Sequence, residues 1–96
     1  MVKLISITKD NETQKKYVAK FLLDDGKYKV SRFGAKGYND YTLTGDDKQR
    51  ERYWKRHEKD LSDDVTTPGM LSLFILWGNS TDIDDNIKAY KKSFNL

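Results

Sequence analysis

The chain has 96 residues, of which 36% are hydrophobic and 34% are charged, and its formal net charge is +3. This length suits one domain with one modest core, so we expect a single domain over residues 1–96. Six tyrosines, four phenylalanines and two tryptophans supply core material, which excludes the low hydrophobicity and high net charge of a disordered chain. The absence of cysteine excludes disulfides, thiolate metal sites and a cysteine nucleophile.

The sequence contains no signal for export or membrane insertion. Its first ten residues, MVKLISITKD, lack the basic start, apolar stretch and cleavage site of a signal peptide. The longest apolar run, Met70 to Trp77, is far shorter than the ~20 residues that span a bilayer. We therefore expect a protein that is not secreted and has no membrane partner.

Turn signals divide the first third of the chain into three predicted strands, over about residues 2–7, 17–23 and 27–33. The polar segment 10–13 breaks the first strand, and Asp24-Asp25-Gly26 is typical of a hairpin. The third strand alternates with a period of two, so that Arg32 shares a face with Tyr28 and Val30. The pattern predicts an antiparallel meander. If the face of Arg32 is the core side, we expect Arg32 to pair with a carboxylate such as Asp40 or to reach the rim.

Residues 34–45 contain three glycines and two tyrosines, which is typical of a loop. Thr44 and Asp47 have the spacing of a capping box, and a helix is predicted from about 46 to 59. Its narrow apolar stripe consists of Tyr53, Trp54, His57 and Leu61.

Two further helices are predicted after it. Thr67 as cap, Pro68 at the first position and Gly78 at the end predict a buried, central helix over 68–77. Ser80 or Thr81 is expected to cap a third helix over about 82–93, whose apolar face is Ile83, Ile87, Tyr90 and Phe94. Strands followed by helices indicate the α+β class: a three-stranded antiparallel meander with three short helices packed on one face.

The sequence offers little for catalysis. His57, the only histidine, lies on the apolar stripe, which favours a half-buried structural residue over a general base. The carboxylates at 82, 84 and 85 fit helix capping better than a calcium loop, which needs a glycine and a closing glutamate. No nucleotide or zinc-protease motif is present. We predict no enzyme, no catalytic residue, no metal, no cofactor and no small-molecule substrate.

Positive charge gathers on one predicted helix face. At 100° per residue, five cations share that face: Lys48, Arg52, Lys55, Arg56 and Lys59. The neighbouring acid-free stretch from Lys27 leads into a loop with exposed aromatics and adds four candidate binding residues: Arg32, Lys36, Tyr38 and Tyr41.

Three interpretations of this basic surface remain open. It can bind a phosphate backbone, or dock an acidic protein surface with Tyr and Arg as anchors. It can also be a solvated helix face, with Glu51 and Lys55 as an i,i+4 pair. A net charge of only +3 argues against a dedicated nucleic-acid coating protein.

Several motifs in order resemble those of an uncharacterised family of roughly hundred-residue proteins encoded by large nucleocytoplasmic DNA viruses. The resemblance extends from Tyr17 to Phe94 and rests on these strings: Phe33-Gly34-Ala35-Lys36-Gly37-Tyr38, Asp40-Tyr41-Thr42, Arg52-Tyr53 with Arg56-His57, Thr67-Pro68-Gly69, Leu71-Ser72 and Ile75-Leu76-Trp77. Where the family has a histidine soon after the Asp-Tyr-Thr motif, this chain has Thr44, which weakens any metal or acid–base site there.

The resemblance implies a virion protein, present in the host cytoplasm or nucleus before assembly. The favoured expectation is a minor capsid or cement-type protein whose partners are larger capsid subunits. The alternative is a small genome-binding protein that uses the basic helix face and the adjacent loop. An enzyme or host-factor modulator that uses a cluster of Asp40, Tyr41 and His57 is the least favoured interpretation.

Overall fold

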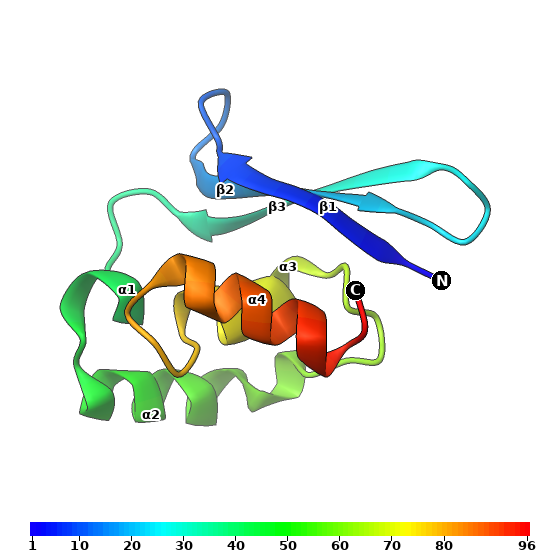
Figure 1. Ribbon diagram of the computed structural model, residues 1–96. Helices are drawn as coiled ribbons and strands as arrows, with labels where there is room; N and C mark the ends of the chain where they lie inside the picture. Colours follow the sequence, from blue (N-terminus) through cyan, green and yellow to red (C-terminus); the bar gives the residue numbers. More distant parts are fainter.

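The computed structural model describes residues 1–96 and consists of a three-stranded sheet with short helices on one of its faces (Figure 1). The strands are β1 (Lys3–Lys9), β2 (Lys15–Leu22) and β3 (Tyr28–Ala35). The helices are α1 (Tyr41–Thr44), α2 (Asp47–His57), the 3-10 turn η1 (Glu58–Asp60), α3 (Pro68–Leu71), the π-helix η2 (Ser72–Leu76) and α4 (Ile83–Ser93). The predicted α+β class and order of elements are confirmed. None of the helices is long and apolar enough to cross a membrane.

The sheet is an antiparallel meander in the order β1-β2-β3, as predicted. Gly26 closes the β2–β3 hairpin with a φ of 82°, a conformation that glycine adopts without steric cost. The turn between β1 and β2 is organised by Asp10, whose carboxylate accepts hydrogen bonds from the N–H groups of Glu12 (2.8 Å) and Thr13 (3.1 Å) and from the Thr13 hydroxyl. The β2–β3 pairs keep one register from Lys15–Ala35 to Leu22–Tyr28, whereas the β1–β2 register shifts once, between Leu4 and Ser6.

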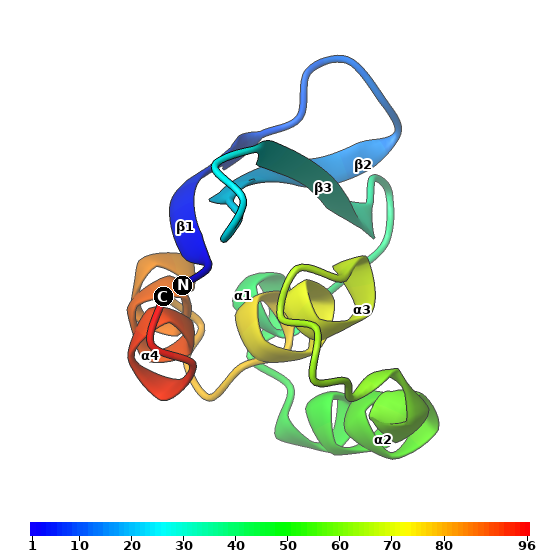
Figure 2. The same ribbon diagram turned by 90° about the vertical axis from the view of Figure 1, so that its right-hand side faces the viewer.

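The helices cover the face of the sheet that carries Ala19, Phe21 and Phe33, which are at most 1% exposed. On β3 this inner face also includes Ser31, whose hydroxyl donates to the carbonyl oxygen of Thr66 at 2.6 Å. A small polar residue therefore packs inward because a loop carbonyl partners it. The two views in Figures 1 and 2 show the opposite face free of helices.

Arg32 lies on the open face of the sheet and not on the core side, so the condition for its expected pairing with Asp40 does not hold, and it pairs with two other carboxylates. Its guanidinium is 3.6 Å from the carboxylate of Asp10 and 3.3 Å from that of Glu12. Tyr28 and Val30 share this face and are more than half exposed. Because Tyr28 and Val30 are apolar, the sequence pattern was compatible with burial of the face of β3 that is in fact exposed.

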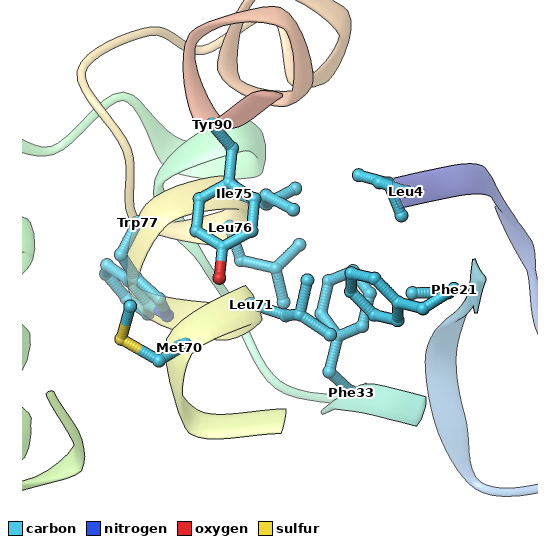
Figure 3. Packing of buried hydrophobic residues seen from close by; sticks show 10 residues of the cluster. Leu4, Phe21, Phe33, Met70, Leu71, Ile75, Leu76, Trp77 and Tyr90 are labelled. Atoms are coloured by element: carbon cyan, nitrogen blue, oxygen red, sulfur yellow. The ribbon is translucent and has the colours of Figure 1, made fainter. Parts of the chain in front are cut away.

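The core lies between the sheet and the segment formed by α3 and η2 (Figure 3). Leu71, Leu73 and Ile75 are 0% exposed, which confirms that the predicted helix over 68–77 is central and buried. Complete burial of such a side chain contributes roughly 1.5–3 kcal/mol. The other buried apolar residues are Leu4, Ala19, Phe21, Phe33, Met70, Leu76, Trp77 and Tyr90.

This central segment begins as predicted but is not one regular helix. The Thr67 side chain accepts from the N–H of Met70 at 3.3 Å, and Pro68 occupies the first helical position. After Leu71 the chain widens into the π-helix, in which the N–H of Trp77 donates to the carbonyl oxygen of Ser72 at 3.0 Å. Gly78 follows for a steric reason, because a Cβ there would lie 2.8 Å from the Asn86 side chain.

The predicted caps of the other two long helices are each displaced by one or two residues. Asp46, not Thr44, caps α2, and Asp82, not Ser80 or Thr81, caps α4. The hydroxyl of Thr44 accepts the N–H of Asp46, and that of Ser80 accepts the N–H of Asp82. The hydroxyl residues therefore position the aspartates that cap, since a carboxylate accepts from the first helical N–H groups more strongly.

Within residues 34–45, predicted to be a loop, the structure contains the four-residue helix α1. Asp40 caps it by accepting from the N–H of Thr42 at 2.9 Å, and Gly45 ends it with a φ of 62°. So short a helix leaves no periodic pattern in the sequence. It turns the chain from the end of β3 towards α2 (Figure 1).

Candidate functional site

Helix α2 contains no fully buried residue and lies farthest from the sheet (Figure 2). Its attachment is polar at one point: Nε of Arg50 donates to the carbonyl oxygens of Trp77 (3.0 Å) and Gly78 (2.7 Å). The indole Nε1 of Trp54 donates to the same Trp77 oxygen at 2.6 Å. These carbonyls follow η2, and helix ends leave unpaired carbonyls with partial negative charge, which favour a cation.

A stack of three rings forms the second attachment of α2. Tyr53 lies between Trp77, at 4.2 Å between ring centroids, and His57, at 4.1 Å. Nδ1 of His57 is 3.2 Å from Oδ2 of Asp60. Tyr53, Trp54 and His57 are half-buried, as the predicted stripe requires. Leu61, in contrast, is 49% exposed.

Because this side of α2 faces the body of the molecule, the five predicted cations face solvent. We call this surface the basic stripe: Lys48, Arg52, Lys55, Arg56 and Lys59, the last in η1. All five are exposed, and none of their side chains forms an ion pair or a hydrogen bond. The pair between Glu51 and Lys55, expected for an ordinary solvated face, is not formed.

The two long edges of the basic stripe differ. At 100° per residue, Glu51 and Glu58 lie along one edge, and Asp47 lies beyond them. On the other edge Arg56 and Gln49 turn towards the β3–α1 loop. The stripe is therefore acidic on one side and opens into a hollow on the other.

This hollow, which we call the cleft, has a volume of about 600 Å³ and lies between the β3–α1 loop, α2 and η2. Tyr38 and Asp40 line it from the loop, and Gln49, Arg56 and His57 line it from α2. Such a volume falls in the range of small-ligand pockets. The floor includes three residues of the central segment: Ser72, Leu76 and Trp77.

A buried ion pair closes one end of the cleft. Nζ of Lys16 is 2.5 Å from Oδ2 of Asp40 and 2.5 Å from the carbonyl oxygen of Tyr38, and the side chains of the pair are 14% and 3% exposed. Because Asp40 also caps α1, its carboxylate has no free oxygen for a ligand. Lys16 and Asp40 neutralise each other, which leaves Arg56 as the uncompensated charge of the cleft.

The least favoured interpretation, a cluster of Asp40, Tyr41 and His57, has no support in the contacts. The Tyr41 hydroxyl donates to Asp47 at 2.6 Å, which raises the pKa of Tyr41, while His57 contacts Asp60. The three side chains have separate partners. Moreover, no group of three or more His, Cys, Asp or Glu residues is arranged to hold a metal ion.

The structure brings together only part of the predicted binding set. Tyr38 is 73% exposed and lines the same cleft as Arg56. Arg32 lies on the open face of the sheet, and Nζ of Lys36 donates to the carbonyl oxygen of Thr13 at 2.7 Å, outside the cleft. Tyr41 lies 5.8 Å from the Arg50 guanidinium and is not in the cleft either.

Sequence reasoning missed Lys16 and Gln49, which line the cleft. Lys16 is far from the loop in the sequence, and its pairing with Asp40 arises only through the β2–β3 register. The position of Gln49 on the edge of α2 is readable from the helical period, but an uncharged residue gave no reason to single it out.

A family model described as a family of unknown function, DUF5754, matches residues 5–57. The matched segment runs from β1 to the end of α2, so it includes most of the basic stripe and both walls of the cleft. No curated protein and no solved structure matches the chain.

Proposed function

The chain belongs to this family of unknown function, and we propose that it is a small non-catalytic binding protein that docks an acidic protein surface through α2. One observation carries the proposal: the basic stripe presents five exposed cations without a single intramolecular partner. Unpaired cations on one rigid face steer an anionic partner and fix its orientation.

The surroundings of the stripe favour a protein over a phosphate backbone. Glu51 and Glu58 run along one edge of the stripe and would repel phosphates that lie there. On a protein partner the same edge can face basic or neutral groups. The exposed Tyr38 at the cleft adds an aromatic anchor of the kind that is enriched at protein interfaces.

We further propose that the protein is a virion component of the minor capsid or cement type, with larger capsid subunits as partners. The resemblance to proteins of large DNA viruses supports this setting. The open face of the sheet leaves a second surface, with Tyr28 and Val30 exposed, that a neighbouring subunit can cover.

Carbodiimide cross-linking of purified virus particles tests this proposal, because the reagent joins a lysine amine directly to a carboxylate. We expect cross-links from Lys48, Lys55 and Lys59 to acidic residues of a larger subunit. The lysines of α4 at 88, 91 and 92 are the internal control. Absence of the protein from purified particles, or links from the α4 lysines alone, would contradict the proposal.

The same five cations favour binding of the viral genome as a second candidate function. If all five contact phosphates, the affinity for duplex DNA falls with salt at a log–log slope of about −4.5, since each contact contributes about −0.9. Fluorescence anisotropy with a labelled duplex measures this slope. No binding at ~50 mM salt eliminates the candidate.

A further inference from the structure

The cleft contains hydrogen-bond donors that the fold does not use. The Arg56 guanidinium has no partner, and Gln49 uses its Oε1 to accept from the Thr44 hydroxyl at 3.1 Å, so both N–H groups of its amide remain free. With the only carboxylate of the cleft already bound to Lys16, the remaining groups suit an acceptor, and the charge of Arg56 suits an anionic one.

The floor of the cleft rests on an uncommon backbone arrangement. π-helical turns are rare and occur frequently at functional sites, and here η2 supplies Ser72 and Leu76 to the floor. Gly34 packs directly on it: its φ is +76°, and a Cβ there would lie 2.8 Å from Cδ1 of Leu76. The absence of a side chain at Gly34 therefore allows β3 to pack closely against Leu76 in the floor of the cleft.

The cleft continues the basic stripe, because Arg56 belongs to both. Along α2 the residues Lys48, Arg52 and Arg56 are spaced by four, which corresponds to a rise of about 6 Å per step. In an extended chain the side chains on one face recur every second residue, about 6.6–6.8 Å apart. Alternate residues of an extended segment therefore match the spacing of these cations.

We propose that the cleft receives one carboxylate side chain of an extended acidic segment in which acids occupy every second position. The preceding acids of that segment contact Arg52 and Lys48, and the last one contacts Arg56 inside the cleft. This inference rests on the proposed function and specifies the sequence pattern of the acidic partner.

Two labelled hexapeptides of equal charge test the pattern by fluorescence anisotropy at ~50 mM salt, where surface electrostatics are weakly screened. In one, three glutamates alternate with three serines; in the other, three serines precede three consecutive glutamates. The substitution Asn39→Trp is designed to fill the cleft with a large side chain, because Asn39 lines it. Asn11→Trp is the matched control, because both asparagines are exposed and neither side chain forms a hydrogen bond, but Asn11 lies outside the cleft. Circular dichroism verifies that both variants are folded.

We expect the wild-type protein to prefer the alternating peptide, and Asn39→Trp to weaken that binding about tenfold, the effect of losing one partly buried charged contact. Asn11→Trp should bind like the wild type. Equal affinity of the wild type for both peptides, or unchanged binding by Asn39→Trp, overturns the inference.

The variant Arg52→Glu shows whether a negative result contradicts only the inference about the cleft or also the proposed function. If Arg52→Glu weakens binding of both peptides but Asn39→Trp does not, the basic stripe binds acids without the cleft, and only the inference fails. If the wild type binds neither peptide, both the inference and docking to an acidic surface fail.

Discussion

Tyr53 stacks on Trp77 with ring centroids 4.2 Å apart and ring planes within 7° of parallel. Trp77 is 6% exposed and belongs to the core, whereas Tyr53 belongs to a helix that has no fully buried residue. Together with the edge-on contact of Trp54 with Phe74 (5.2 Å between centroids), it links the helix that carries the basic stripe to the core.

Replacing this tyrosine should loosen α2 while the rest of the fold persists. For Tyr53→Ala we expect a loss of about 2 kcal/mol in the free energy of unfolding, from lost ring packing and a partly open cavity. Amide hydrogen exchange should accelerate in α2 more than in the sheet. Tyr53→Phe retains the stack and serves as the control. Unchanged exchange of the α2 amides in Tyr53→Ala would contradict the conclusion that Tyr53 attaches α2 to the core.

Arg50 is a structural cation, unlike its neighbours on α2. Arg50→Ala leaves the carbonyl oxygens of Trp77 and Gly78 without the guanidinium, and we expect chemical denaturation to show a loss of about 1–2 kcal/mol. Arg50→Lys should restore little, because an ammonium lacks the planar geometry of the guanidinium. Arg52→Ala, which removes an unpaired cation, should change stability by less than about 0.5 kcal/mol. Equal effects of the two alanine variants would refute this distinction.

Substitutions at Gly34 and Gly37 distinguish the cost of backbone strain from the cost of a steric clash, because both glycines have a positive φ but only Gly34 is in close contact with another residue. Gly37 has a φ of +86° and open space around its Cβ position, so Gly37→Ala should cost about 1 kcal/mol of left-handed strain. Gly34→Ala adds the contact with Leu76 and should cost about 1–3 kcal/mol more, measured as the difference in unfolding free energy. If the two variants are equally stable, the floor of the cleft is not in contact with β3.

Stability should fall in acid through the turn between β1 and β2. The Thr13 hydroxyl, the N–H groups of Glu12 and Thr13, and nearby Arg32 lower the pKa of Asp10 from 3.8 to about 2. The folded state therefore binds fewer protons than the unfolded state between these values, so this contribution is complete above pH 3.8 and is lost as the pH falls towards 2.

Urea denaturation at a series of pH values measures this loss. Asp10→Asn removes the titrating group, so the stability of the variant should depend less steeply on pH between 4 and 2 than that of the wild type. Thr13→Val should raise the pKa of Asp10 towards its ordinary value, so the stability lost between pH 4 and 2 should be smaller than in the wild type. A wild type and an Asp10→Asn variant with parallel pH profiles would be the contrary result.

The elements of the fold were predictable because their signals are local. The turn at Asp24–Gly26 and the Thr67-Pro68 start each act within a few residues, and both were found at the predicted places. The caps of α2 and α4 were misplaced because a hydroxyl and an aspartate stand close together, and only the backbone geometry decides which one accepts. Periodicity could not indicate that the helix over 68–77 widens into a π-helix at Ser72, since both forms bury nearly every side chain.

Only the part of the candidate site that lies on a single helix or strand was predictable from the sequence. The five cations of the basic stripe follow from the helical period of α2 alone. The sequence left open which face of β3 points inward, because Ser31 is buried through a loop carbonyl that is far away in the sequence. The cleft needs β2, the β3–α1 loop, α2 and η2 together, so no local pattern indicates it.

The central claim is that the basic stripe binds an acidic protein surface. Isothermal titration of poly-glutamate into the wild type and into the variant carrying Arg52→Glu and Lys55→Glu tests it most directly, with Lys88→Glu on α4 as control. We predict binding by the wild type and by Lys88→Glu at ~50 mM salt, weaker binding at higher salt, and none by the double variant. Equal binding by the double variant, or no binding by the wild type, would contradict the claim.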